Sequence, residues 1–372
     1  MKTIIPILVF VISTLLASVT EAQTPTTTFT TIEGANLRGK LEAATRQGQT
    51  HGSRYWVAYS FDVRPSVTTD TDVTINGNSI WVNGVSVGSN HETRNLALFL
   101  LYDAATITRI EIYNLDRKRE YSSYPVYWLG RANNDESLSW LQGLVNNQSD
   151  DKLNERATMA IALHDDKNVG PILKGLTSKA HPERVRKTAI FWLGHSEGER
   201  EYLADFVRNE QESLEIRKQA AFGLGISKDQ GALTTLQNLF AQVTGRELKR
   251  QIIFAISINE NKDGAADFLI NTASNEQDRE LKKQAMFWLG QRAGERSLKF
   301  LGDVVEKNAE DVEVQKQAIF AISQRQKNEA VPLLIRVAQS HPSLAVRKQA
   351  IFWLGQSGDD RAVAYFKELF AK

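Results

Sequence analysis

A basic residue followed four positions later by phenylalanine recurs six times in this 372-residue chain. In a helix, residues four apart lie one turn above each other on the same face, so each pair places a cation beside an aromatic ring. Such pairs could hold an extended acidic peptide or another anionic polymer through charge and apolar contact. The residues predicted to bind a partner are Lys187, Phe191, Lys218, Phe222, Arg250, Phe254, Lys283, Phe287, Lys316, Phe320, Lys348 and Phe352.

A structural interpretation of the same residues remains open. The phenylalanines could pack on one another between neighbouring helices, while each cation pairs with a glutamate one turn earlier. Each such pair would stabilise its helix by only about 0.2 to 0.5 kcal/mol. Pairs with the required spacing are Glu183/Lys187, Glu215/Lys218, Glu247/Arg250, Glu280/Lys283 and Glu313/Lys316.

Other residue patterns do not predict a catalytic or metal centre. The six histidines show no His-x-x-x-His or His-Glu-x-x-His spacing, and the absence of cysteine excludes thiolate sites and disulfides. The sequence also lacks Gly-x-Ser-x-Gly, phosphate-loop and dinucleotide motifs. His164-Asp165-Asp166 could hold a cation weakly, although such loop acids are usually just solvated. We therefore predict no catalytic residues, no metal and no cofactor.

The basic and aromatic pairs belong to a longer repeat. Its anchor positions lie 31 to 33 residues apart, at Tyr127, Met159, Phe191, Phe222, Phe254, Phe287, Phe320 and Phe352. So regular a period indicates one supersecondary unit stacked on copies of itself. Trp128, Trp192, Trp288 and Trp353 share the next position, and we expect them in the core.

Each unit is predicted to be two helices joined by a turn. In the last copy, Val346, Ala350 and Leu354 form one apolar helical stripe. A second stripe runs from Ala330 to Val337, and His341-Pro342-Ser343 separates the two. Gly355 is expected to end the motif helix, because glycine adopts the left-handed conformation common at helix ends.

The Val-Arg-x-x-Ala-x-x-x-Leu-Gly spacing at residues 185–194 and 346–355 resembles the HEAT repeat family, including its bacterial short-repeat branch that also occurs in phycobilin lyases. The resemblance covers residues 121–372. It implies an all-α solenoid of about eight repeats whose second helices line the concave side. HEAT arrays often carry an Asp/Arg ladder in their turns. Here the Arg positions are kept at Arg186, Arg217 and Arg347, whereas Ala180, Gln211 and His341 stand where Asp is expected.

Residues 33–120 differ in character and predict a small, mostly antiparallel β domain. Residues 55–63 and 107–113 are rich in aromatic and β-branched side chains. Asn76-Gly77 and Asn83-Gly84 predict two tight hairpins, and residues 96–113 a third. Residues 36–47 could form a short helix. We expect this domain to cover the first helical unit, although Arg54, Tyr55, Trp56, Tyr59 and Trp81 could instead mark a recognition surface.

The two ends of the chain carry further signals. Residues 1–22 resemble a secretory signal peptide, with a retained anchor as the alternative, and residues 23–32 form a Thr-rich flexible lead-in. Asn147-Gln148-Ser149 would be a glycosylation acceptor only in a eukaryotic host. At the other end, residues 360–372 predict a capping helix with Ala362, Val363, Phe366, Leu369 and Phe370 facing inward.

Charge and composition narrow the class of function. Forty-five basic residues against 44 acidic ones give a net charge of +1, which argues against a nucleic-acid or membrane-surface binder. We predict an α+β multidomain, non-enzymatic scaffold in the periplasm or outside the cell that binds a protein or peptide on its concave face. After cleavage it would not be an integral membrane protein. A chromophore- or ligand-handling protein of the bilin-lyase type, and an envelope spacer that binds through its β domain, are the alternatives.

Overall fold

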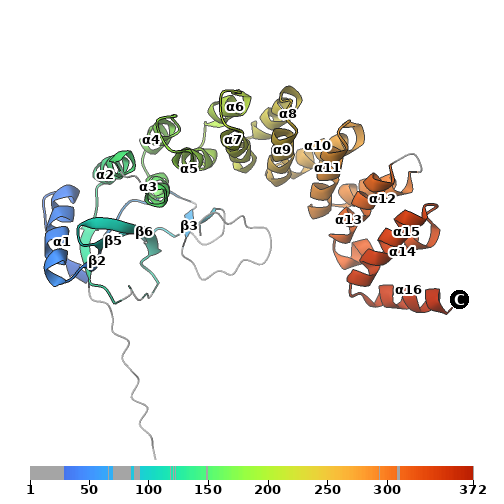
Figure 1. The fold of residues 1–372 in the computed structure, drawn as a ribbon, viewed down its shortest axis with the longest axis horizontal. Helices are drawn as coiled ribbons and strands as arrows, with labels where there is room; N and C mark the ends of the chain where they lie inside the picture. Colours follow the sequence, from blue (N-terminus) through green and yellow to red (C-terminus); the bar gives the residue numbers. More distant parts are fainter. Residues whose placement is uncertain are drawn as a thin grey trace, which may run out of the picture.

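The computed structural model describes residues 29–65, 67–69, 85–87, 93–117, 119, 121, 123–147, 150–292, 294–307 and 311–371. Several predictions concern residues outside these ranges: the signal peptide 1–22, most of the lead-in 23–32, both Asn-Gly hairpin turns, Trp81, and Gln148 and Ser149. In the described part, a small sheet with one helix precedes a long arch of helices (Figure 1). This arrangement confirms the predicted fold class.

The N-terminal sheet is mixed. Its strand order is β1-β7-β2-β5-β6, and β3 and β4 form a separate antiparallel pair. The pairings β2–β5 and β5–β6 are antiparallel as predicted, but β7 runs parallel to both β1 and β2. The bounds are β1 (Phe29–Thr31), α1 (Leu37–His51), β2 (Arg54–Ser60), β3 (Val67–Thr69), β4 (Val85–Val87), β5 (Leu96–Asp103), β6 (Thr106–Asn114) and β7 (Val126–Arg131).

The first copy of the repeat motif is a strand, so its prediction as part of a helical unit was wrong. Tyr127 and Trp128 lie in β7, where Tyr127 is buried between the neighbouring strands. A short run of aromatic and β-branched residues does not distinguish strand from helix by itself. Pro125 before the run and Gly130, with φ of 77°, keep it short. The helices begin at Asn134 rather than at residue 121.

From Asn134 onward the chain forms stacked helix pairs, which confirms the predicted helix-turn-helix unit. In Figure 1, α2, α4, α6 and α8 follow the outer edge of the arch, and α3, α5, α7 and α9 follow its inner edge. We call α3, α5, α7, α9, α11, α13 and α15 the inner helices, because each contacts the next. The bounds are α2 (Asn134–Asn147), α3 (Asp151–Leu163), α4 (Val169–Leu176), α5 (Glu183–Gly194), α6 (Arg200–Arg208), α7 (Leu214–Ile226), α8 (Ala232–Gln242), α9 (Arg246–Ile258), α10 (Lys262–Asn275), α11 (Arg279–Gln291), α12 (Glu295–Glu306), α13 (Val312–Ser323), α14 (Lys327–Ser340), α15 (Leu344–Gln356) and α16 (Asp360–Phe370).

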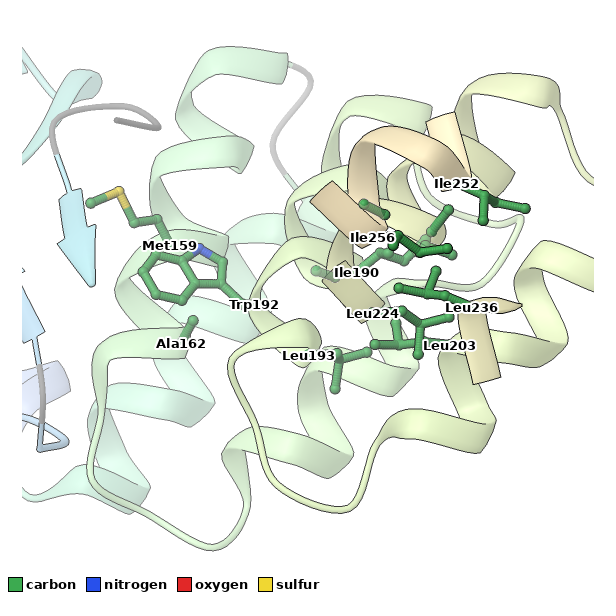
Figure 2. Close-up of a cluster of buried hydrophobic side chains, with 14 of the residues drawn as sticks. Met159, Ala162, Ile190, Trp192, Leu193, Leu203, Leu224, Leu236, Ile252 and Ile256 are labelled. Atoms are coloured by element: carbon green, nitrogen blue, oxygen red, sulfur yellow. The ribbon is translucent and has the colours of Figure 1, made fainter. Parts of the chain in front are cut away.

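The apolar stripe of each inner helix faces the paired outer helix. Val346, Ala350 and Leu354 are buried on α15, and the equivalent residues are buried in the earlier repeats. Figure 2 shows this packing between α5 and α9, where Ile190, Leu193, Leu203, Leu224, Leu236, Ile252 and Ile256 come together. The core therefore runs along the length of the arch rather than forming one central cluster.

The glycine near the end of the motif does not end the helix as predicted. Gly290 lies inside α11 and Gly355 inside α15, and neither has positive φ. A Cβ on Gly290 would lie 2.5 Å from the Ala321 carbonyl oxygen, and one on Gly194 would lie 2.7 Å from the Gly223 Cα. The glycine lets adjacent inner helices approach closely. A Cβ on Gly355 would meet nothing within 4 Å, since no inner helix follows α15 in the described chain.

The arginines at the HEAT-like position bind carbonyl groups, and Arg186 also forms an ion pair with Glu212 at 2.8 Å. Arg186 Nε donates to the Thr177 carbonyl at 2.7 Å, and Arg217 Nε donates to the Val207 carbonyl at 2.9 Å. These carbonyls belong to the ends of the preceding outer helices, which lack partners within the helix and carry partial negative charge. The interaction ties the two helices of a repeat together.

The sheet joins the solenoid through a buried polar network. His164 Nδ1 donates to the Ala160 carbonyl at 2.8 Å, so Nε2 accepts from Ser137 Oγ at 2.9 Å. Ser137 Oγ in turn lies 3.0 Å from Tyr59 Oη on β2. Burial lowers the pKa of His164 to about 4, which keeps the imidazole neutral as this network requires. His164 is therefore a structural residue, and its ring nitrogens are both engaged in this network.

The C-terminal helix is rotated relative to the predicted cap. Ala362 and Tyr365 of α16 are buried, but Val363, Leu369 and Phe370 are exposed. The contacts with α14 and α15 use the side of α16 that carries Ala362 and Tyr365. The predicted inward face was therefore wrong for three of its five residues, and α16 leaves apolar side chains in solvent.

Candidate binding surface on the inner helices

The six predicted pairs lie on consecutive inner helices, on the side turned away from the outer helices. Phe191 on α5, Phe222 on α7, Phe254 on α9, Phe287 on α11 and Phe320 on α13 are each partly exposed. Phe352 on α15 is 54% exposed. The structure thus brings these predicted site residues onto one surface along the inside of the arch.

The rings stack on one another from repeat to repeat. Ring centroids of Phe191 and Phe222 are 6.1 Å apart, and those of Phe222 and Phe254 are 5.9 Å apart, both with nearly parallel planes. Phe287 and Phe320 stack in the same way at 6.1 Å. The packing that the structural interpretation predicted is therefore present, yet the rings keep an open side toward the inside of the arch.

Two tryptophans extend this row of rings. Trp288 lies 5.0 Å from Phe254, and Trp353 lies 5.2 Å from Phe320, in both cases across a boundary between repeats. Both are partly buried and pack against the core, as Trp128 does on β7, so the expected core position is met only in part, whereas Trp192 is buried. We call the whole set the aromatic ladder: Phe191, Phe222, Phe254, Phe287, Trp288, Phe320, Phe352 and Trp353.

Four of the six cations form the predicted ion pair one turn earlier. The distances between nitrogen and carboxylate oxygen are 3.0 Å for Lys218/Glu215, 3.5 Å for Arg250/Glu247, 3.2 Å for Lys283/Glu280 and 2.8 Å for Lys316/Glu313. The hydrogen bond from Lys218 also lowers the pKa of Glu215. These pairs are exposed, so they neutralise the surface only in part and stabilise it little.

The remaining two cations make no ion pair, although Lys187 lies close enough to Glu215 to help lower the pKa of that carboxyl group. The Glu183/Lys187 pair is not formed, because Glu183 Oε2 instead accepts from Ser213 Oγ at 2.9 Å. Within the part of the chain that the structure describes, Lys187 and Lys348 make no ion pair or hydrogen bond. One free cation therefore lies toward each end of the aromatic ladder.

A row of glutamines also lines this surface, and the sequence interpretation missed it. Each glutamine directly follows a cation of the ladder, so the signal was the repeated Lys-Gln dipeptide. The side chains are partly exposed, and an amide offers both a donor and an acceptor, which suits a peptide backbone. Arg250 Nε donates to one of them, Gln284 Oε1, at 3.4 Å. The row consists of Gln219, Gln251, Gln284, Gln317 and Gln349.

A hollow of about 460 Å³ lies at the N-terminal end of the ladder, between α3, α5 and α7. Its apolar lining is Met159, Phe191, Trp192 and Phe222. Met159 occupies the anchor position on α3, where each of α5, α7, α9, α11, α13 and α15 carries phenylalanine. Figure 2 shows the Met159 side chain beside the Trp192 indole. The hollow therefore lies where the ladder lacks a ring.

Charged residues surround the opening of the hollow. Glu155, Glu183, Arg184 and Lys187 contribute to its lining. Arg184 Nε forms an ion pair with Glu155, and Glu183 accepts from Ser213, so both acids already have partners. Lys187 is the lining cation that has none among the described residues.

Neither a metal site nor a membrane-spanning helix is found in the described residues. No three histidine or acidic side chains gather there in a way that could hold a metal ion. None of the described helices combines the length and apolar character needed to cross a membrane. What the surface offers is apolar contact, amide hydrogen bonds and local positive charge.

Comparison with known proteins identifies the repeat. Residues 298–372 match the family model of HEAT repeats. The match covers only the C-terminal repeats. This match confirms the resemblance drawn from the sequence, and the helix pairs before residue 298 continue the same stack. Comparison with curated proteins gives no match.

Solved structures with similar helical stacking include three proteins of low sequence identity. Human deoxyhypusine hydroxylase in complex with glycerol is 15% identical, with a TM-score of 0.30, covering 59% of this chain and 88% of that chain. The Escherichia coli protein YibA is 14% identical, with a TM-score of 0.37 and coverage of 64% and 89%. The complex of CpcE and CpcF of phycocyanin lyase from a Nostoc species is 16% identical, with a TM-score of 0.32 and coverage of 68% and 97%. At such identities and scores, none of them lends its activity to this chain.

Proposed function

We propose that this protein is a non-enzymatic scaffold that binds an extended segment of a partner protein along its inner helices. The observation that carries the proposal is the aromatic ladder, whose rings pack on one another yet remain open along the inside of the arch. A contiguous, partly exposed apolar row bordered by polar residues is typical of an interaction site. The curved surface of a solenoid suits a long partner segment.

The glutamine row and the ladder cations add hydrogen bonds and charge to the apolar contact of the ladder. Amides of the glutamine row can pair with the backbone of an extended segment, which otherwise would lose its hydrogen bonds to water on binding. The ladder cations border the same row and favour a partner with acidic side chains. Because four of these cations already have glutamate partners, apolar contact and amide hydrogen bonds contribute more than net charge.

A charge reversal in the middle of the ladder tests the proposal. The double variant Lys283→Glu/Lys316→Glu should retain much less partner than the wild type when the tagged protein is used for affinity capture from its own cell envelope. Both side chains lie beside ladder rings, and each reversal replaces an i,i+3 ion pair with two like charges, at a cost of only about 0.2 to 0.5 kcal/mol each. Circular dichroism should therefore show an unchanged helical fold.

A matched control separates local from overall charge. Lys299→Glu/Lys307→Glu makes the same charge change on exposed side chains of α12 and its C-terminal end, an outer helix. This control should capture the partner like the wild type. Equal capture by all three proteins, with intact helical folds, would contradict binding along the inner helices.

The proposal also includes a location outside the cytoplasm, which rests on the signal-like residues 1–22. N-terminal sequencing of the protein purified from its own cells should begin at Gln23. A chain that keeps its first 22 residues would favour an anchor instead.

A further inference from the structure

The hollow beside α3 lies at the position where the aromatic ladder has no ring. Phe191 stacks on Phe222 on one side, at 6.1 Å. On the other side, α3 presents Met159 instead of a ring, and the hollow of about 460 Å³ lies between them. Pockets for small organic groups begin at roughly 300 Å³, so an aromatic side chain fits the available space.

The walls of the hollow suit an aromatic ring in particular. Phe191 and Trp192 meet edge to face with centroids 5.2 Å apart, so two aromatic surfaces already border the space. Met159 adds a flexible, polarisable thioether, and sulfur contacts with ring edges are favourable. An incoming ring would continue the stacking that Phe222 and Phe254 carry onward along the arch.

The opening of the hollow holds one cation without an ion-pair partner. Glu155 pairs with Arg184, and Glu183 accepts a hydrogen bond from Ser213 Oγ rather than pairing with Lys187. Lys187 is partly exposed, one helical turn before Phe191, and makes no ion pair within the described residues. A carboxylate next to the bound ring would therefore find an ammonium group that has no ion-pair partner.

The N-terminal sheet indicates which carboxylate this is. Strand β6 packs against α3, and Arg156 on α3 forms an ion pair with Glu111 on β6 at 4.0 Å. In Figure 1 the sheet lies below α2 and α3, at the N-terminal end of the inner edge. Because α3 is the first of the inner helices in the described chain, a segment that follows the ladder has no further inner helix to follow beyond the hollow, and the sheet lies next to α3.

We infer that the hollow binds the C-terminal residue of the partner segment, an aromatic residue whose free α-carboxylate pairs with Lys187. The inference rests on the proposed function, since it places one end of the segment that the inner helices bind. It assigns the direction of that segment, with its C-terminus at α3 and its upstream residues on α5 and the later inner helices.

Methionine methyl NMR provides a direct test. The sequence contains three methionines, Met1, Met159 and Met286, and Met286 is buried on α11, far along the chain from the hollow. The probe is acetyl-Gly-Gly-Phe with a free carboxylate, titrated into full-length protein carrying ¹³C-methyl methionine. The Met159 methyl signal should shift because a bound ring lies beside it, while the Met286 signal stays in place.

Two further peptides and three variants define the chemistry. The C-terminal amide of the same peptide should bind at least about fivefold more weakly, because it lacks the charge-assisted contact. Acetyl-Gly-Gly-Ala should not shift Met159. Lys187→Gln should abolish the difference between acid and amide, whereas Lys348→Gln, which removes the other free ladder cation, should keep it. Met159→Phe fills the hollow with a ring, so this variant should not bind the probe. Competition of the probe with a labelled peptide measures its binding.

The outcomes that overturn the inference are distinct from those that overturn the scaffold. An unmoved Met159 signal at saturating probe, or an acid-to-amide ratio that Lys187→Gln leaves unchanged, would refute the C-terminal site. If capture of the natural partner still depended on Lys283 and Lys316, the scaffold would stand without it. Conversely, a responsive hollow with partner capture indifferent to Lys283 and Lys316 would support the hollow and refute binding along the ladder.

Discussion

The two ends of the solenoid are finished in different ways. At the N-terminal end, the sheet closes the stack, with Tyr59, Ser137 and His164 in one buried network. At the C-terminal end, α16 covers α15 only in part, so that Phe352 is 54% and Phe370 83% exposed. Repeat stacks need a covered end because each unit buries its apolar face against the next. Here the sheet provides this cover at one end, and the other end stays partly open.

The same contrast appears within a single motif position. Gly290 touches the backbone of the next inner helix, whereas its equivalent Gly355 has open space around it. Phe320 has ring neighbours on both sides, whereas Phe352 contacts only Trp353 among the described rings. How much a motif residue contributes to stability thus depends on the neighbouring repeat that it contacts, not on its own helix.

Acid should weaken the N-terminal end first, and this is the largest effect we expect. Burial lowers the pKa of both His164 and His195 to about 4, from an ordinary value near 6.5. The unfolded chain then takes up protons below pH 6.5 while the folded chain does not, so stability falls as the pH drops from 6.5 to 4. At pH 5 each histidine should cost about 2 kcal/mol relative to pH 7. Urea unfolding followed by circular dichroism at the two pH values measures this difference.

The C-terminal end supplies the contrast for this experiment. Hydrogen bonds from Arg361 lower the pKa of Asp359 to about 2, so this carboxylate stays charged throughout the window. The double variant His164→Gln/His195→Gln should lose most of the pH dependence between pH 7 and 5. A wild type equally stable at both pH values would contradict the role given to His164 and His195.

The second prediction compares equivalent glycines. Gly290→Ala places a methyl group 2.5 Å from the Ala321 carbonyl oxygen, against backbone that cannot swing aside. The inner helices α11 and α13 must then separate, at a cost of about 1 to 3 kcal/mol. Gly355→Ala meets no atom and should be neutral or stabilising by up to about 1 kcal/mol, since alanine is the better helix former. Urea midpoints of the two variants measure the difference, and equal midpoints would show that the close helix contact is unimportant.

The sequence predicts those parts of the fold that depend on local spacing. The helix pairs and the placement of Phe222, Phe254 and Phe320 on one surface follow from the 3.6-residue helical period and the regular repeat. The β-structure of Tyr127 could not be read in this way, because it depends on pairing with β1 and β2, far away in the chain. A short apolar run is compatible with either element.

The parts of the candidate site that escaped prediction depend on contacts between repeats. Met159 was visible as an anchor position without a ring, but the hollow beside it appears only once α3 and α5 are placed together. The ring contact of Trp288 with Phe254 was not predicted, because Phe254 lies in the previous repeat. The exposed face of α16 likewise depends on packing, because the helix is rotated so that Tyr365 is buried. The sequence of α16 alone does not determine this rotation.

The smallest change in the free energy of unfolding should come from replacing ladder rings, either within the stack at Phe320 or at its open end at Phe352. Phe320→Leu keeps an apolar side chain but removes ring contacts with Phe287 and Trp353, and should cost about 0.5 to 1.5 kcal/mol. Phe352→Leu removes one ring contact at an exposed site and should cost less than about 0.5 kcal/mol. Urea unfolding of the two variants gives the comparison. A larger loss for Phe352 than for Phe320 would mean that the open end is covered in solution, which would remove the contrast between the two ends.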